Sequence, residues 1–146
     1  MKKINLHCGE QTRSDCINID IRPEFRDCSA QDEYCLNFNE GSCSEIIVNP
    51  GCLESIPKED IARILLTWKN SLKAGGSLWV NFADVRPMFN KVSYERMPLS
   101  ELEGFVCQTR SMWDMDSVRS LLPAGGFSIH SSNYTDFIGT VHAIKE

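Results

Sequence analysis

A single amphipathic helix between two apolar strands constrains this fold more than any other feature of the sequence. A helix is predicted over Lys58–Lys73, because apolar side chains recur there at a spacing of three and four residues. These side chains are Ile61, Ile64, Leu65, Trp68 and Leu72. Gly75-Gly76 ends the helix, and apolar runs flank it at Glu45–Asn49 and Ser77–Phe82. A strand–helix–strand unit of this kind predicts a helix packed on a parallel sheet.

The rest of the chain continues this alternation. Further strands are predicted at Ile4–Cys8, Ile17–Ile21, Phe127–Ser132 and Phe137–Ile144. Further helices are predicted at about Leu99–Val106 and at Met115–Ala124, the second with Asp114 as its N-cap. The last two strands are expected to form an antiparallel hairpin. We therefore predict one α/β domain over residues 1–146, with a mostly parallel sheet, helices on both faces and an antiparallel C-terminal strand pair.

The first two strands are joined by an unusually short segment. Residues 9–15 leave no room for a full crossover helix, which normally takes a dozen residues or more. Either the connection is a reduced first crossover or the two strands pair differently. The polar residues that follow each strand are the candidates for a site, because ligands bind at the carboxyl ends of the strands in open sheets of this type.

Composition argues against several classes of partner. The formal net charge is −5 without any basic run, which argues against nucleic acid. No apolar run approaches the roughly 20 residues that cross a bilayer, and the stretch after the basic start is too short for a secretion signal. The seven cysteines include no C-x-x-C pair, so free thiols in a reducing cytosol are expected rather than a metal site. We therefore expect a cytoplasmic protein with no metal, no nucleic acid and no membrane partner.

The order of these segments resembles the class I S-adenosylmethionine-dependent methyltransferases, in particular the short members of the type 11-like group. Ile4–Gly9 resembles the first strand with its glycine loop, and Ile17–Ile21 resembles the second strand with its terminal acid. Leu36–Pro57 resembles the region around the fourth strand. Leu72–Leu78, which reads Leu-Lys-Ala-Gly-Gly-Ser-Leu, resembles the turn into the fifth strand, and Gly125–Phe127 resembles a later turn. The resemblance spans nearly the whole chain and implies a Rossmann-like sheet with S-adenosylmethionine as cofactor.

The resemblance also implies which acids bind that cofactor. Asp20 would accept hydrogen bonds from the two ribose hydroxyls, and Ile21 follows it in the cofactor site. Asp32 would accept from the adenine amino group, with a backbone N–H of the neighbouring Glu33 reading the ring. Asp27 is a rival for the role of Asp32.

The glycine loop departs from the family pattern. His7 stands where the first glycine is expected, and Gly9 remains to let the backbone approach the cofactor. His7 would either contact the cofactor's carboxylate or intrude on its space. Asn49, with Pro50-Gly51 after it, would face the methyl-transfer site.

The resemblance leaves the methyl acceptor and any catalytic residue unidentified. An acceptor that is a small molecule or a cell-envelope precursor is expected, covered by the segment Met88–Trp113; alternatively, that segment fills the core beneath a long loop. The alternative function is an inactive binding or partner module, favoured by the sparse glycines. A nicotinamide enzyme is disfavoured because no G-x-G-x-x-G pattern opens a helix. An exposed edge strand would allow a homodimer.

Overall fold

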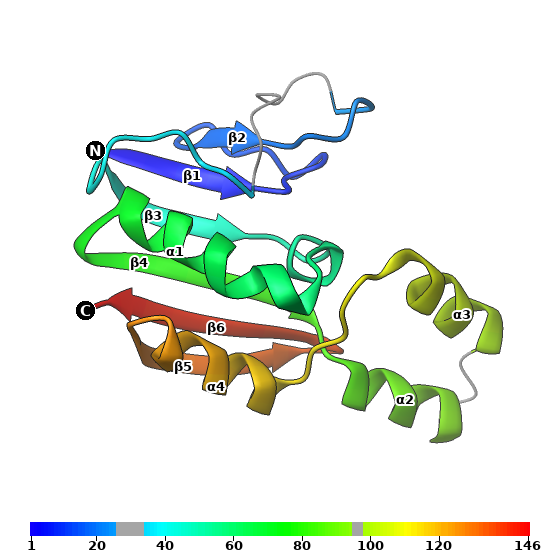
Figure 1. The fold of residues 1–146 in the computed structure, drawn as a ribbon. Helices are drawn as coiled ribbons and strands as arrows, with labels where there is room; N and C mark the ends of the chain where they lie inside the picture. Colours follow the sequence, from blue (N-terminus) through cyan, green and yellow to red (C-terminus); the bar gives the residue numbers. More distant parts are fainter. Residues whose placement is uncertain (26–33, 95–97) are drawn as a thin grey trace.

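The computed structural model contains one six-stranded mixed sheet, drawn in Figure 1, and describes residues 1–25, 34–94 and 98–146. In spatial order the strands are β2 (Ile17–Ile19), β1 (Lys2–Leu6), β3 (Cys43–Val48), β4 (Leu72–Ala83), β6 (Ile138–Lys145) and β5 (Phe127–Thr135). The first four run parallel, and β6 is antiparallel to both β4 and β5. The predicted α/β class, mostly parallel sheet and antiparallel C-terminal pair are confirmed.

The strands fall where the sequence predicts them, with shifts at their ends. β1 stops at Leu6, two residues earlier than predicted, because His7 has a φ of 56° and turns the chain out of the extended conformation. One row of the sheet is wholly buried: Ile4 pairs with Ile46, Ile46 with Leu78 and Leu78 with Ala143. This row fixes the register, because a slip of one residue would expose it to solvent.

Four α-helices are described. They are α1 (Ile61–Ser71), α2 (Val85–Tyr94), α3 (Leu99–Gln108) and α4 (Met115–Ala124). Before α1 the predicted helix is a 3-10 turn at Lys58–Asp60, and after it Leu72 is already extended and pairs with Cys43. The predicted N-cap of α4 is confirmed, since the Asp114 carboxylate accepts from the Ser117 amide at 2.7 Å. The helix α2 is not predicted from the sequence.

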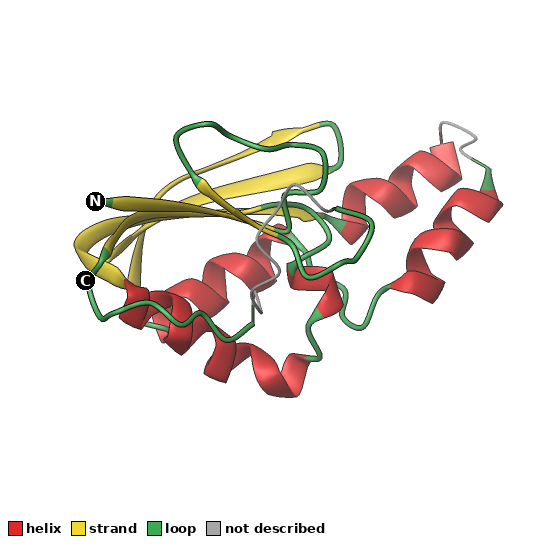
Figure 2. Cartoon of the chain, turned by 90° about the horizontal axis from the view of Figure 1, so that it is seen from above, coloured by secondary structure: helices red, strands yellow, loops and turns green. Residues whose placement is uncertain are grey.

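The helices in the described part of the chain lie on one side of the sheet or beyond its end. Helices α1 and α4 share a single core with one sheet face, and Figure 2 shows them on the same side. Helices α2 and α3 project past the carboxyl ends of the strands (Figure 1). The predicted placement of helices on both faces is thus wrong for these residues, because the β1–β2 connection contains no helix. The opposite face carries a cavity of about 340 Å³ lined by Arg13, Glu45, Ile47, Trp79 and Asn81.

A buried asparagine closes the reduced first crossover. Residues 7–16 join β1 to β2, and the two strands nevertheless pair in parallel. The amide of Asn5, which is fully buried, donates to the carbonyl of Gln11 and to Oδ1 of Asn18, both at 2.9 Å. Asn18 in turn binds the amide and the carbonyl of Arg13. These side-chain bonds hold the loop against the strands, a role that a crossover helix normally fills by packing.

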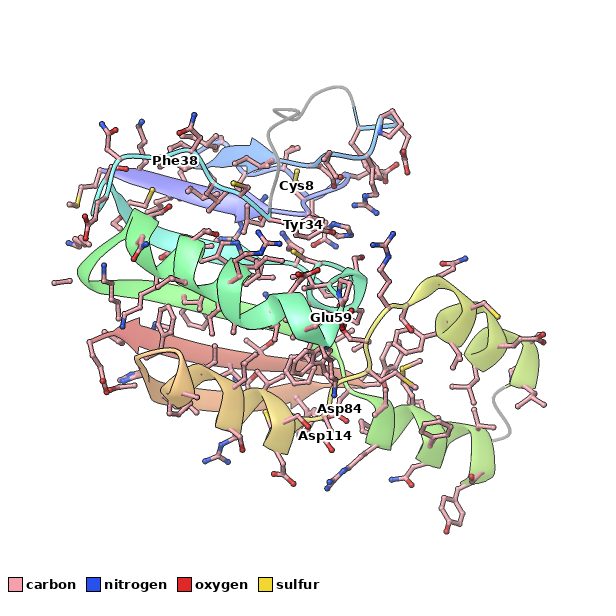
Figure 3. All side chains as sticks on the ribbon, viewed as in Figure 1. Cys8, Tyr34, Phe38, Glu59, Asp84 and Asp114 are labelled. Atoms are coloured by element: carbon pink, nitrogen blue, oxygen red, sulfur yellow. The ribbon has the colours of Figure 1, made fainter. Side chains whose placement is uncertain are left out.

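A buried carboxylate joins the other elements at the carboxyl end of β4. Asp84 is fully buried and accepts from the amides of Arg86 and Met115 at 2.9 and 2.8 Å. Its Oδ2 also accepts from the Tyr134 hydroxyl at 2.8 Å; burial and this hydrogen bond raise the pKa of Tyr134 to about 12. Figure 3 shows Asp84 beside Asp114, where α2 and α4 begin. Asp84 therefore fixes two helices and β5 relative to β4.

Three further findings concern membranes, thiols and metal ions. No helix within residues 1–25, 34–94 and 98–146 is both long and apolar enough to cross a bilayer. The cysteines described carry free thiols, and Cys8, Cys43 and Cys52 among them are buried. No group of three His, Cys, Asp or Glu side chains that could hold a metal ion occurs among the described residues.

The hydrogen bonds of Asn5 predict that removing its side-chain amide lowers the stability of the protein strongly. Asn5→Ala removes the donors to Gln11 and Asn18 and leaves buried polar groups without a partner, so we expect the free energy of unfolding to fall by about 2 kcal/mol or more. Urea unfolding followed by tryptophan fluorescence measures this loss. The exposed Asn90 in α2 gives the matched control, for which Asn90→Ala should change stability by less than about 0.5 kcal/mol. Equal effects of the two substitutions would contradict the assigned role of Asn5.

Candidate functional site

Two adjoining cavities lie at the carboxyl ends of β1 and β3. The first has a volume of about 380 Å³ and is lined mainly by the glycine loop after β1, together with Phe25 and Asn49. The second has a volume of about 460 Å³ and extends toward α3 and the β5–β6 turn. His7, Arg22 and Pro50 line both cavities and form the wall that they share. Both volumes lie in the range of small-molecule sites, and the position is the one at which open parallel sheets bind ligands.

The loop after β1 has the backbone conformation of a glycine loop, although His7 occupies one of the glycine positions. His7 and Gly9 both have left-handed φ angles, of 56° and 52°. A non-glycine residue is strained in this region by roughly 1 kcal/mol. The His7 ring is buried and packs on Gly51, where an added Cβ would come within 2.9 Å of Nε2. The conformation suited to the missing glycine is therefore preserved, and the imidazole fills the space that the glycine would leave.

The carboxylate of Asp20 follows β2 and is already bound by this chain's own groups. Its Oδ1 accepts from Arg22 Nε at 2.9 Å and from the Arg22 amide at 3.0 Å. Its Oδ2 accepts from Arg22 Nη2 at 2.6 Å and from the Gly9 amide at 2.8 Å. Burial raises the pKa of Asp20, but the hydrogen bonds from Arg22 and Gly9 outweigh it and lower the pKa to about 2. Asp20 is therefore ionised at neutral pH, and both of its oxygens accept from the guanidinium.

The space beside the glycine loop is occupied as well. A Cβ added at Gly9 would lie 3.4 Å from Arg22 Nη2 and 3.5 Å from the Phe25 ring. The Arg22 guanidinium lies over that ring, 4.4 Å from its centroid. The backbone of the loop thus fits a cofactor that approaches closely, but the side chains of Arg22 and Phe25 stand in the way. In this conformation the cavity does not accommodate a ribose on Asp20.

A buried glutamate forms the floor of the second cavity. Glu54 is 2% exposed, and its carboxylate accepts from the Ala83 amide at 2.5 Å and from the Gly51 amide at 2.8 Å. Burial raises the pKa of Glu54, and the two amides oppose this effect. The carboxylate links the loop after β3 to the end of β4. It thereby fixes the distance between the two strands that frame the cavity.

Asn49 lines the first cavity and also completes the asparagine network. Its amide donates to Oδ1 of Asn5 and to the carbonyl of Leu6, both at 2.7 Å. These bonds connect the end of β3 to β1. The amide nitrogen is thus committed to the scaffold, and a contact of Asn49 with a cofactor stays a prediction.

The structure brings together His7, Gly9, Asp20 and Asn49 from the predicted site. Ile21 is 47% exposed and does not line either cavity. Asp32 and Glu33, with the rival Asp27, lie outside the described residues.

Sequence reasoning missed two residues that the geometry brings out, Phe25 and Glu54. It included Arg22 among the candidates that follow a strand but missed the pairing of Arg22 with Asp20. A signal existed only for Arg22, since a cation two residues after a strand-terminal acid can fold back onto it. Phe25 lies in a stretch with no periodic pattern. Glu54 reads as a solvated acid in a Leu-Glu-Ser segment.

The fold matches solved S-adenosylmethionine-dependent methyltransferases over the whole chain. A structure from Methanosarcina mazei superposes with a TM-score of 0.73 at 15% identity, covering 99% of this chain and 92% of that chain. One from Thermotoga maritima has a TM-score of 0.76 at 12% identity, covering 99% and 82%. One from Mesorhizobium loti has a TM-score of 0.70 at 11% identity, covering 99% and 90%.

At these identities the likeness concerns the fold. No family model and no curated protein matches the sequence. The chain has the fold of the class I S-adenosylmethionine-dependent methyltransferases, which confirms the fold that the sequence resemblance implies.

The depressed pKa of Asp20 predicts a specific loss of stability in acid. A carboxyl whose pKa is lowered on folding stabilises the native state above its unfolded pKa of about 4, and this contribution is lost as the pH falls through about 2. Asp20→Asn lacks the contribution, so the gap in unfolding free energy between wild type and variant should narrow between about pH 4 and pH 2. Urea unfolding across this range measures the gap. Asp60→Asn, which alters an exposed ion pair with Arg63, is the control, and its difference in unfolding free energy from wild type should be small at every pH. A difference for Asp20→Asn that stays constant between about pH 4 and pH 2 would refute the prediction.

Proposed function

We propose that this protein is an S-adenosylmethionine-dependent methyltransferase that acts on a small molecule or a cell-envelope precursor. The observation that carries the proposal is the hydrogen bond from the Gly9 amide to Asp20, which holds this strand-terminal acid directly behind the glycine loop. That loop lines the first cavity, next to a second cavity of about 460 Å³. The fold shared with methyltransferases supports it. The second cavity has the size of a pocket for a small acceptor.

The cofactor, when bound, supplies an electrophilic methyl group on a sulfonium. Asp20 is the acceptor available to a ribose diol once Arg22 has withdrawn, since its two oxygens match two hydroxyl donors. Gly9 allows the backbone to approach because it carries no side chain. The Gly9 amide keeps the Asp20 carboxylate in position in either state.

The second cavity provides for the acceptor. Phe105, Phe137 and Ile138 line it with apolar surface, and Gln108 and Thr109 add hydrogen-bonding groups. Apolar walls exclude water, and the polar groups orient an acceptor at the boundary with the first cavity. Transfer of a methyl group from a sulfonium to a good nucleophile depends mainly on such positioning. No general base is assigned.

A second candidate function is a binding or partner module without turnover. The observation that favours it is that the expected cofactor contacts are taken up by the chain itself. Arg22 binds both oxygens of Asp20, and His7 replaces a glycine in the loop after β1. Such a module would fail to bind the cofactor, or would bind it without transferring a methyl group.

Cofactor binding by the purified protein separates these functions. Isothermal titration with S-adenosylmethionine and S-adenosylhomocysteine should show binding at micromolar strength. Asp20→Asn should weaken it by more than about tenfold, which corresponds to the loss of a charge-assisted hydrogen bond. Asp60→Asn serves as the matched control and should bind like wild type. Absence of heat and of thermal shift at millimolar ligand would favour the inactive module, and an unchanged affinity for Asp20→Asn would remove Asp20 from the site.

His7→Gly tests whether the imidazole obstructs the loop. Glycine adopts the φ of 56° without strain and opens the space next to Gly51, so we expect tighter binding of S-adenosylhomocysteine than in wild type. Parallel titrations of the two proteins measure the difference. Unchanged binding would mean that His7 does not limit access to the cavity.

A further inference from the structure

We infer that Arg22 is an internal competitor for the ribose diol, so that the chain binds a nucleoside only by exchanging one bidentate partner of Asp20 for another. This inference rests on the proposed function and adds a device that controls the same site. Three observations support the inference. Arg22 and Asp20 form a bidentate pair, and Arg22 and Phe25 pack against Gly9. Arg22 also lies in the wall between the two cavities.

The guanidinium imitates the donor pattern of a cis-diol. Nε and Nη2 of Arg22 donate to the two separate oxygens of Asp20, at 2.9 and 2.6 Å. Two vicinal hydroxyls would donate to the same two oxygens. A ligand with only one hydroxyl replaces one of the two bonds and leaves the other oxygen without this partner, so the exchange favours ligands that carry both hydroxyls.

The position of the Asp20 carboxylate does not depend on the Arg22 side chain alone. The amides of Gly9 and Arg22 each donate to one of its oxygens, and both belong to the backbone. These bonds hold the carboxylate in place after the side chain of Arg22 withdraws. The carboxyl itself is fully buried, whereas 37% of the Arg22 side chain is exposed, so the cation is the partner that can move into solvent.

The departure of Arg22 also changes the space beside the glycine loop. The guanidinium and the Phe25 ring together form the surface nearest to Gly9, and they lie over each other. Withdrawal of the cation uncovers one face of the ring and the open side of Gly9 at the same time. The measured affinity for a nucleoside is then the intrinsic affinity reduced by the fraction of molecules in which Arg22 has withdrawn.

The test compares Arg22→Gln with wild type by isothermal titration. The probes are S-adenosylhomocysteine, adenosine and 2′-deoxyadenosine. We expect Arg22→Gln to bind the first two at least about tenfold more tightly than wild type, since the competing charge-assisted bonds are gone. 2′-Deoxyadenosine should bind more weakly than adenosine to both proteins, because it replaces only one of the two bonds. Arg63→Gln is the control, because Arg63 forms a similar but exposed ion pair with Asp60 and should leave all three affinities unchanged.

A second measurement uses wild-type protein and does not depend on the variant's folding. The side-chain Nε–H signal of Arg22 is followed by NMR during titration with S-adenosylhomocysteine. Its chemical shift should move away from the carboxylate-bound position, and its protection from solvent exchange should fall. A signal that is unchanged at saturating ligand would refute the inference.

The titrations distinguish failure of this inference from failure of the proposed function. If wild type binds and Arg22→Gln binds equally or more weakly, Arg22 is not a competitor, and the proposed function stands. If only Arg22→Gln binds, the inference is supported and the wild-type chain is held closed. If neither protein binds at millimolar ligand, Asp20 accepts no ribose, and both proposals are overturned.

Discussion

The contacts of Asn5 hold the amino-terminal half of the sheet together. Its side chain lies between β2 and β3 and binds groups from both sides: Asn18 across one strand pair and Asn49 across the other. The ten residues that join β1 to β2 contain no crossover helix, so hydrogen bonds hold this connection where a helix would otherwise hold it by packing. A buried amide is stabilising only when its partners are all present, which makes this network sensitive to a single change. The loop that carries Gly9 and the strand that ends before Asp20 take their positions from it.

Buried carboxylates play a similar role at the carboxyl ends of the parallel strands, where they connect separate elements by hydrogen bonds. Asp84 joins β4 to α2, α4 and β5, and Glu54 joins the loop after β3 to β4. Each is a buried carboxylate that accepts backbone amides. Asp20 is similar in its bonds to Gly9 and differs in its bond to a partly exposed arginine side chain.

The elements with a strong period were predictable from the sequence, and the contacts between distant residues were not. Helices α1 and α4 follow from their apolar faces, and the cap at Asp114 follows from residue type. Helix α2 escaped prediction because Met88 is its one buried apolar residue, so its pattern resembles a loop. Asn5 and Asn49 lie 44 residues apart, and a pattern along the chain cannot report that they meet. The sequence placed Asp20 at the end of a strand, but whether its oxygens are free depends on the side-chain conformation of Arg22.

The order of the strands has a consequence for synthesis on the ribosome. Strand β5 attaches to the sheet only through β6, which follows it in the chain and lies between β5 and β4. Until Ile138–Lys145 has paired, β5 has no strand partner, although it packs on α4, and β4 presents an open edge of unpaired backbone groups. The nascent chain therefore passes through a stage in which an apolar strand is available to other molecules.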